Sequence, residues 1–302
     1  MLKKIGVGFL IIVATALIWY LFIKPSDYII NFKVVTTPGT VTQSVKSWNY
    51  DVPDSEIIVQ DGLHKVVQQR HFGDSVVNYT YEAKMINDSV TQVSVGVKDL
   101  DHSLINRLTA PFKNTLFRKR STENVETFFE ILREHLDQIK IEVTGLDQTR
   151  STFVAYVPLK GLQVEKARGM MQYYGYIGDV LLKNHVELNG PPIIEVTDWD
   201  TETDSISYNF CFPIIRSENL PISKDIKYKR LFQKEAVHAV YNGNYITSDR
   251  AWYALLEYAK NNNLAVEKKP VEIFYNNPNM GGNELDWKAD IYLPLKQDSP
   301  LE

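Results

Sequence analysis

The sequence predicts an α+β protein with an N-terminal membrane helix and two globular domains. Three observations support this prediction: an uncharged apolar run at residues 5–23, a set of period-2 segments followed by a helical apolar stripe, and two β-α-β-β patterns separated by about 80 residues. The predicted domains are residues 1–25, 26–148 and 149–297. The net charge of −4 and the short length of the basic run at residues 113–120 argue against nucleic acid as a partner.

The apolar run at residues 5–23 predicts one transmembrane helix, in contact with the lipid bilayer. At about 1.5 Å per residue it crosses a hydrocarbon core of roughly 30 Å, and Trp19 and Tyr20 suit the headgroup layer. The alternative is a cleaved signal peptide, whose apolar region is usually about 7–15 residues long and ends in small residues. Lys3 and Lys4 before the run predict a cytoplasmic N-terminus and a single-pass protein whose globular domains lie outside the cytoplasm.

Residues 26–148 alternate apolar and polar residues in short segments. Turn pairs such as Gly73-Asp74 and Asn87-Asp88 separate consecutive segments, which predicts an antiparallel meander. A capping signal at residues 121–124 then opens a helix whose apolar residues recur at three- and four-residue spacing. The predicted elements are a strand at 28–35, a short helix at 37–48, strands at 56–60, 64–72, 76–85 and 90–98, and a long helix at 121–139. This order resembles the START-like, polyketide-cyclase-type helix-grip family, in which the space between helix and sheet often holds an apolar ligand.

The polar segment at residues 145–150 marks the predicted domain boundary, and after it a different pattern occurs twice. The first copy has a strand at 152–157, a helix at 163–185, and strands at 193–198 and 206–215. The second has a strand at 236–241, a helix at 248–262, and strands at 271–275 and 286–295. Two β-α-β-β units in tandem predict a pseudo-twofold domain.

This duplicated half resembles the gyrase-inhibitor-like effector-binding family, which also supplies the drug-sensing domains of some transcription activators. The match rests on a late strand with an acidic residue, an Asn-Pro turn, a Gly-Gly loop and a final strand ending in Leu-Pro, at residues 271–294. The first copy echoes it at residues 193–198 and 208–213 but lacks the Asn-Pro turn. In that family the groove between the copies binds amphipathic, often cationic organic molecules, and no DNA-binding module accompanies the domain in this sequence.

The resemblance implies that Glu272 faces the ligand among aromatic rings. A carboxylate in an apolar groove needs a cation to neutralise it, and aromatic faces add cation–π attraction of about 0.5–2 kcal/mol. The alternative is a surface glutamate on an edge strand. The predicted ligand-binding residues are Glu272, Phe274, Tyr241, Tyr245 and Trp287.

Other candidate residues favour packing over chemistry. The run Met170-Met171-Gln172-Tyr173-Tyr174 suits an adaptable pocket wall, but core packing of the first helix is the favoured interpretation. The six histidines show no metal-binding spacing, so we expect no metal and no cofactor. Cys211, in an apolar strand, is expected to be a small buried hydrophobe.

The predicted function is therefore binding of a small amphipathic, possibly cationic, molecule without turnover. One alternative is a hydrolase of small reactive compounds, in which Glu272 with a raised pKa activates water in a dry groove. The other is an envelope interaction protein that binds no ligand. A filled groove with no cavity would favour this last alternative, whereas a cavity with a buried unpaired carboxylate would favour either of the first two.

Overall fold

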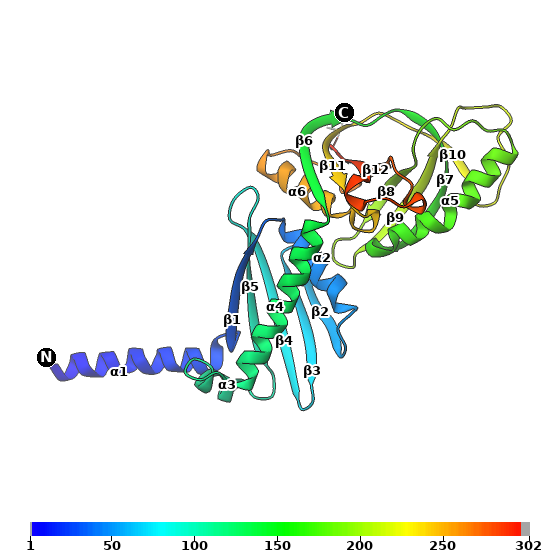
Figure 1. The fold of residues 1–302 in the computed structure, drawn as a ribbon. Coiled ribbons are helices and arrows are strands. Elements are labelled where there is room, and N and C mark those ends of the chain that lie inside the picture. The colour runs from blue at the N-terminus through cyan, green and yellow to red at the C-terminus, as the bar shows by residue number, and fades with distance from the viewer. Residues whose placement is uncertain (1, 297–302) are drawn as a thin grey trace. The chain divides into compact units, whose positions relative to one another are not determined.

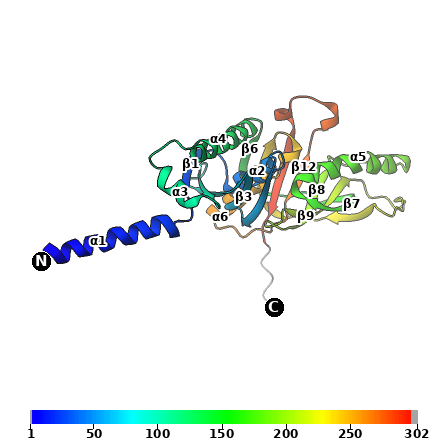
Figure 2. The same ribbon diagram turned by 90° about the horizontal axis from the view of Figure 1, so that it is seen from below.

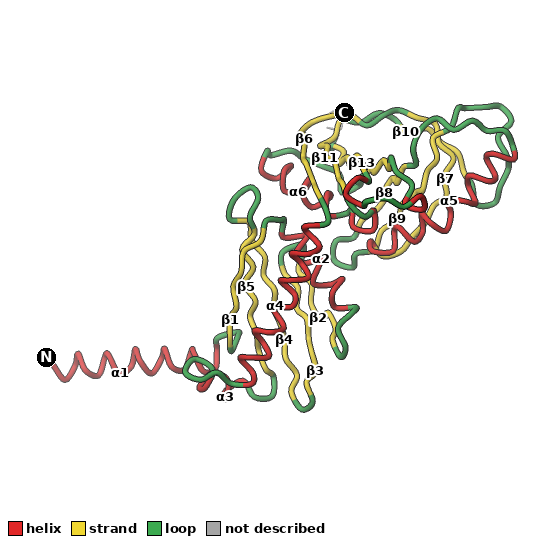
Figure 3. Tube along the Cα trace, in the orientation of Figure 1, coloured by secondary structure: helices red, strands yellow, loops and turns green. Residues whose placement is uncertain are grey.

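The computed structural model describes residues 2–296, whose internal contacts divide the chain into two compact units, residues 1–133 and 134–302. Each unit is built on an antiparallel sheet with helices on it, which confirms the predicted α+β class (Figures 1 and 3). The division falls inside one long helix, α4 (Leu116–Asp137).

The N-terminal helix does not take the predicted form of one uninterrupted span. An α-helix, α1 (Leu2–Ile18), is followed by a five-residue π-helix, η1 (Trp19–Ile23), so the regular α-helical hydrogen bonding stops at Ile18. Within residues 2–296, no helix has both the length and the apolar character needed to cross a membrane. The predicted transmembrane helix is therefore not confirmed.

A buried arginine fastens the end of this N-terminal segment to its unit. The guanidinium of Arg107, from α3 (Ser103–Thr109), donates to the carbonyls of Tyr20, Leu21 and Lys24 at 3.1, 3.0 and 2.6 Å. Its Nε donates to Asp27 at 2.7 Å, and both side chains are almost fully buried. The carbonyls at the end of a helix need such donors, because they have no partner within the helix.

The first unit is a five-stranded sheet in the order β1-β5-β4-β3-β2. The aromatic ring of Phe128 on α4 packs against Trp48 and Tyr81, with ring centroids 5.4 and 5.2 Å apart, so α4 lies on one face of the sheet (Figure 2). The remaining elements are β1 (Tyr28–Val34), α2 (Pro38–Asn49), β2 (Ser55–Asp61), β3 (Lys65–Phe72), β4 (Ser75–Met85) and β5 (Thr91–Asp99).

The long helix begins earlier than the sequence predicts. Helix α4 starts at Leu116, because the hydroxyl of Thr115 accepts a hydrogen bond from the backbone N–H of Arg118 at 3.2 Å and so caps the helix. Ser121, the expected cap, is fully buried within the helix instead. The meander and helix are as expected from the sequence, but membership of the START-like family is not confirmed.

The second unit is an eight-stranded antiparallel sheet in the order β10-β7-β9-β8-β12-β13-β11-β6. It contains the predicted duplication. The first repeat is β7 (Thr152–Leu162), α5 (Lys166–Lys183), β8 (Ile193–Trp199) and β9 (Ser205–Pro213). The second is β11 (Glu235–Asn242), α6 (Arg250–Asn261), β12 (Val271–Phe274) and β13 (Lys288–Pro294).

Two further strands, absent from the sequence prediction, join the repeats. Strand β6 (Lys140–Gln148) pairs with β11, and β10 (Lys227–Leu231) pairs with β7. Between these ladders the backbone N–H of Thr149 donates to the carbonyl of Lys234 at 2.9 Å. The residues from 140 to 156 and from 227 to 242 therefore form one nearly continuous two-stranded ladder, which we call the bridging ladder.

Candidate functional site

An apolar groove lies between the two repeats, on the side of the sheet that carries α5. It has a volume of about 160 Å³, and we call it the helix-side groove. Helix α5 of the first repeat supplies one wall, and the second repeat supplies the other. Its lining residues are Ala167, Met170, Met171, Tyr174, Pro192, Asn244, Tyr245, Ile246, Phe274, Asn276, Asn277, Pro278, Asn279 and Trp287.

Three of the five predicted site residues meet in this groove. The ring of Tyr245 lies 4.6 Å from that of Phe274 and 5.9 Å from that of Trp287, measured between centroids. The hydroxyl of Tyr245 donates to the carbonyl of Lys288 at 2.8 Å and accepts from the N–H of Asn276 at 3.1 Å. Burial raises the pKa of Tyr245 to about 12, so this side chain stays neutral. The aromatic wall is fixed by hydrogen bonds to the turn that follows β12.

Glu272, in contrast, does not line the groove. It is fully buried and forms an ion pair with Lys166, whose Nζ lies 2.6 and 2.7 Å from the two carboxylate oxygens. The hydroxyl of Ser248 and the indole N–H of Trp252 also donate to the carboxylate, at 3.0 and 2.8 Å. The ammonium of Lys166 lies 4.7 Å from the Trp252 ring. The protein's own lysine therefore supplies the cation that the sequence analysis assigned to a ligand.

Tyr241, the fifth predicted residue, is also outside the groove. It lies on β11, and its hydroxyl donates to the carbonyl of Asn244 at 2.7 Å and contacts the hydroxyl of Thr247 at 2.9 Å. Burial raises the pKa of Tyr241. This tyrosine stabilises the turn that leads to Tyr245.

For α5 the sequence analysis favoured core packing and gave a pocket wall only as the alternative. Core packing is the wrong interpretation for Met171, which is 65% exposed, whereas the ring of Tyr174 lines the groove and also packs 5.3 Å from that of Phe212. The sequence did contain a pattern that indicates this wall of the groove. The i, i+3, i+4, i+7 spacing of one helix face relates Ala167, Met170, Met171 and Tyr174. That face has methionines where a packed helix usually has branched aliphatic residues, and methionine suits an adaptable wall.

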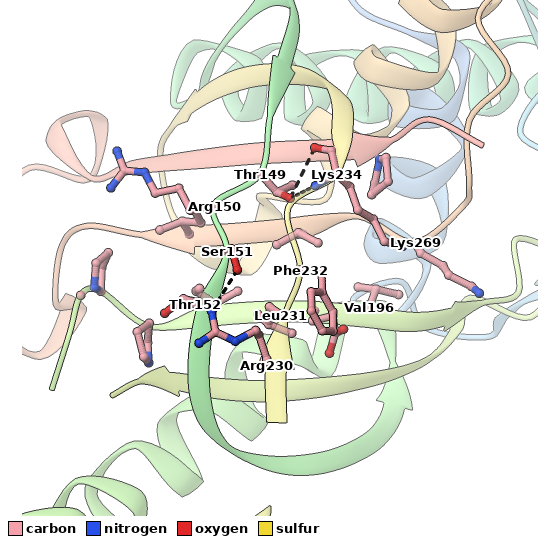
Figure 4. Close-up of a pocket in the computed structure, with 18 of the residues that line it drawn as sticks. Thr149, Arg150, Ser151, Thr152, Val196, Arg230, Leu231, Phe232, Lys234 and Lys269 are labelled. Atoms are coloured by element: carbon pink, nitrogen blue, oxygen red, sulfur yellow. Dashed lines mark hydrogen bonds between the residues drawn. The ribbon is translucent and has the colours of Figure 1, made fainter. Parts of the chain in front are cut away.

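A second and larger cavity lies on the other face of the sheet, beneath the bridging ladder. Its volume is about 520 Å³, and we call it the sheet cavity (Figure 4). Figure 4 shows the two segments of the bridging ladder side by side across it, with hydrogen bonds joining Thr149 to Lys234 and Ser151 to Arg230. Apolar residues such as Ile193 line part of it, and Phe232 at its edge is 72% exposed.

The described part of the chain shows no metal site and no reactive thiol. Among residues 2–296, no group of three or more His, Cys, Asp or Glu side chains is placed to hold a metal ion. Cys211 is fully buried in β9, as expected, and burial raises the pKa of its thiol.

The second unit thus combines a duplicated β-α-β-β sheet with an apolar groove between its repeats. Residues 159–296 match the family described as the GyrI-like small molecule binding domain. Residues 159–296 are therefore similar to GyrI-like domains. A search of curated proteins finds no match.

Several solved structures resemble the fold at low identity. The C-terminal domain of EcmrR is 13% identical with a TM-score of 0.44, and the match covers 53% of this chain and 99% of that one. SAV2435 bound to tetraphenylphosphonium is 16% identical with a TM-score of 0.36, covering 50% and 92%. A hydrolase from Listeria innocua is 12% identical with a TM-score of 0.35, covering 51% and 93%. At these TM-scores the likeness carries no conclusion about function.

Proposed function

We propose that the GyrI-like domain binds a small aromatic molecule in the helix-side groove, without turnover. The observation that carries this proposal is the convergence of Tyr245, Phe274 and Trp287 on the exposed methionine face of α5. Aromatic and methionine side chains favour apolar, flat ligands, and a few polar groups at the rim orient them. Four asparagines are among the residues that line this groove: Asn244, Asn276, Asn277 and Asn279.

The charge distribution favours an uncharged ligand over a cation. The carboxylate of Glu272 is already neutralised by Lys166, so a ligand gains little from carrying a positive charge. The groove of about 160 Å³ is also smaller than drug-sized pockets of about 300–1,000 Å³, which favours a compact aromatic group. Hydrolysis by Glu272 gains no support from this geometry, because the carboxylate is fully buried and accepts hydrogen bonds from three side chains.

The proposal is tested by blocking each cavity with an exposed side chain. Met171 at the helix-side groove and Phe232 at the sheet cavity are both largely exposed, so replacing either by arginine leaves folding intact. A neutral coumarin dye is titrated into the wild type, Met171→Arg and Phe232→Arg, with fluorescence anisotropy as the readout. We expect Met171→Arg to weaken binding at least about tenfold, because the new charge must be desolvated by an apolar ligand.

Phe232→Arg is the matched control. The dye can also bind nonspecifically to the exposed apolar side chains of α1, and this contribution is the same in both variants. Equal affinities of all three proteins would rule out the helix-side groove. Loss of binding in Phe232→Arg alone would move the ligand to the sheet cavity. A cationic rhodamine dye, titrated in parallel, should bind no more tightly than the coumarin.

A further inference from the structure

The first unit contains a cavity with two arginines, neither of which has an acidic partner among the described residues. It measures about 350 Å³ and lies where β3, α4 and the end of α2 meet. Strand β3 supplies Arg70 and Phe72, and α4 supplies Arg120 and Asn124. The other lining residues are Trp48, Asp51, Val52, Pro53, Glu123 and Thr127.

The two guanidinium groups gather around one ring. The Cζ atom of Arg120 lies 4.1 Å from the centroid of the Phe72 ring, and that of Arg70 lies 4.8 Å from it. Arg70 donates to the side-chain oxygen of Asn124. Among residues 2–296, no carboxylate lies within ion-pair distance of either arginine, and Glu123 at the rim is paired with Lys119 at 3.8 Å.

Several buried donors at this point have no hydrogen-bond partner within the described part of the chain. They are the Nε of Arg70, the Nε of Arg120 and the side-chain nitrogen of Asn124, a residue that is only 6% exposed. A buried donor without an acceptor destabilises the folded state, and more so when it is charged. Desolvation, with the charge of Arg120 in addition, lowers the pKa of Arg70. An anion between the two arginines would accept hydrogen bonds from these donors and would offset the repulsion between the two positive charges.

We propose that this cavity binds a phosphate group. Arginine guanidiniums bind phosphate oxygens through paired, charge-assisted hydrogen bonds, and the Asn124 amide adds a neutral donor on the same side. The cavity volume of about 350 Å³ admits a phosphate together with a small organic group. The phosphate comes either from a soluble phosphorylated molecule or from a lipid headgroup.

The test follows the thermal midpoint of the full chain as inorganic phosphate replaces sodium chloride at constant ionic strength. A ligand that binds the folded state raises the midpoint in proportion to ln(1 + [L]/Kd). We expect a phosphate-dependent rise in the wild type, and an apparent affinity at least about tenfold lower in Arg120→Gln. Arg118→Gln is the matched control: it removes the same charge two residues away on α4, where the arginine lies over Tyr28 outside the cavity.

A second variant keeps the test informative if removing an arginine perturbs folding. Asn124→Asp places a carboxylate beside Arg70, so it should raise the midpoint without phosphate and abolish the response to phosphate. No midpoint change in the wild type with phosphate, or equal responses in wild type and Arg120→Gln, would overturn the proposal.

Flotation with vesicles separates the two sources of phosphate. Vesicles of phosphatidylcholine are compared with vesicles that also contain phosphatidic acid, using the wild type and Arg120→Gln. A preference for phosphatidic acid that Arg120→Gln abolishes assigns the site to a lipid headgroup. A response to inorganic phosphate without that preference assigns it to a soluble molecule.

Discussion

Lys166 and Glu272 place two opposite charges in the interior of the second unit, and both side chains have no exposed surface. Each is satisfied: the ammonium also donates to Ser248 at 2.7 Å, and the carboxylate accepts from Ser248 and Trp252. A buried pair of this kind adds little net stability compared with an apolar pair, but breaking it leaves an uncompensated charge. Removing one partner is therefore expected to be far more harmful than removing both.

We predict that Lys166→Met destabilises the protein by about 3–5 kcal/mol, the usual effect of breaking a buried ion pair. The double variant Lys166→Met with Glu272→Leu should recover most of that loss, because no buried charge remains. Urea unfolding of the wild type, both single variants and the double variant gives the coupling free energy. Additive effects of the two substitutions would show that the ion pair is not energetically coupled.

Among the individual residues of the site, the sequence predicted the aromatic wall but not the ion pair between Lys166 and Glu272. Tyr245, Phe274 and Trp287 lie close to one another as expected, because the turn residues around them define the ends of the strands. The partner of Glu272 could not be predicted, since Lys166 lies 106 residues away on a helix of the other repeat. No local pattern relates such positions, and only the packing of α5 onto the sheet brings them together.

Helix α5 packs tightly against the sheet at a glycine, Gly169. A Cβ atom at Gly169 would lie 2.2 Å from the hydroxyl oxygen of Tyr208 and 3.2 Å from a methyl carbon of Leu159, whereas Gly175 and Gly178 on the same helix face open space. Tyr208 is 4% exposed and has little room to move. The helix can therefore reach its position against β7 and β9 because residue 169 has no side chain.

We predict that Gly169→Ala lowers the free energy of unfolding by about 1–3 kcal/mol, the usual effect of overpacking. Gly175→Ala in the same helix should raise it by about 0.4–1 kcal/mol, because alanine reduces the entropy of the unfolded chain and meets no neighbour. Chemical denaturation of the two variants provides the comparison. A stabilised Gly169→Ala would show that α5 shifts easily on the sheet.

The elements of the duplicated sheet were predictable because their strands have long apolar stretches, but β6 and β10 were not. In β6 the alternation is interrupted at Gly145, which has a φ of 101° and lies where the ladder with β11 shifts register at His238. Strand β10 is short, with the sequence Lys-Tyr-Lys-Arg-Leu, and lies at an edge of the sheet. Bulges and polar edge strands weaken the period-2 pattern from which strands are predicted.

At the scale of the whole molecule, we predict that a fragment beginning at Glu134 unfolds cooperatively and that a fragment beginning at Thr149 is less stable. The shorter fragment lacks β6 and leaves the edge of β11 unpaired. Thermal unfolding followed by circular dichroism compares the two. Equal midpoints would show that β6 contributes nothing to the second unit.

The location of the protein stays a prediction. Large apolar side chains of α1 and η1, such as Phe9, Leu10 and Phe22, are exposed, and the lysines at positions 3 and 4 precede them in the sequence. If residues 5–23 span a bilayer as the sequence predicts, the positive-inside rule places the chain after them outside the cytoplasm, so alkaline phosphatase fused after Glu302 should be active. An inactive fusion would contradict this prediction.

The bridging ladder also sets the order in which the second unit can be completed during synthesis. Strands β6 and β7 leave the ribosome first, but their partners β11 and β10 lie between residues 227 and 242. At about 5–20 residues per second the ribosome needs several seconds to make the intervening chain, and during this time the N-terminal repeat has unpaired strand edges. The irregularity of β6 at Gly145 then has a further consequence, because it makes this unpaired edge a poor template for pairing with other nascent chains.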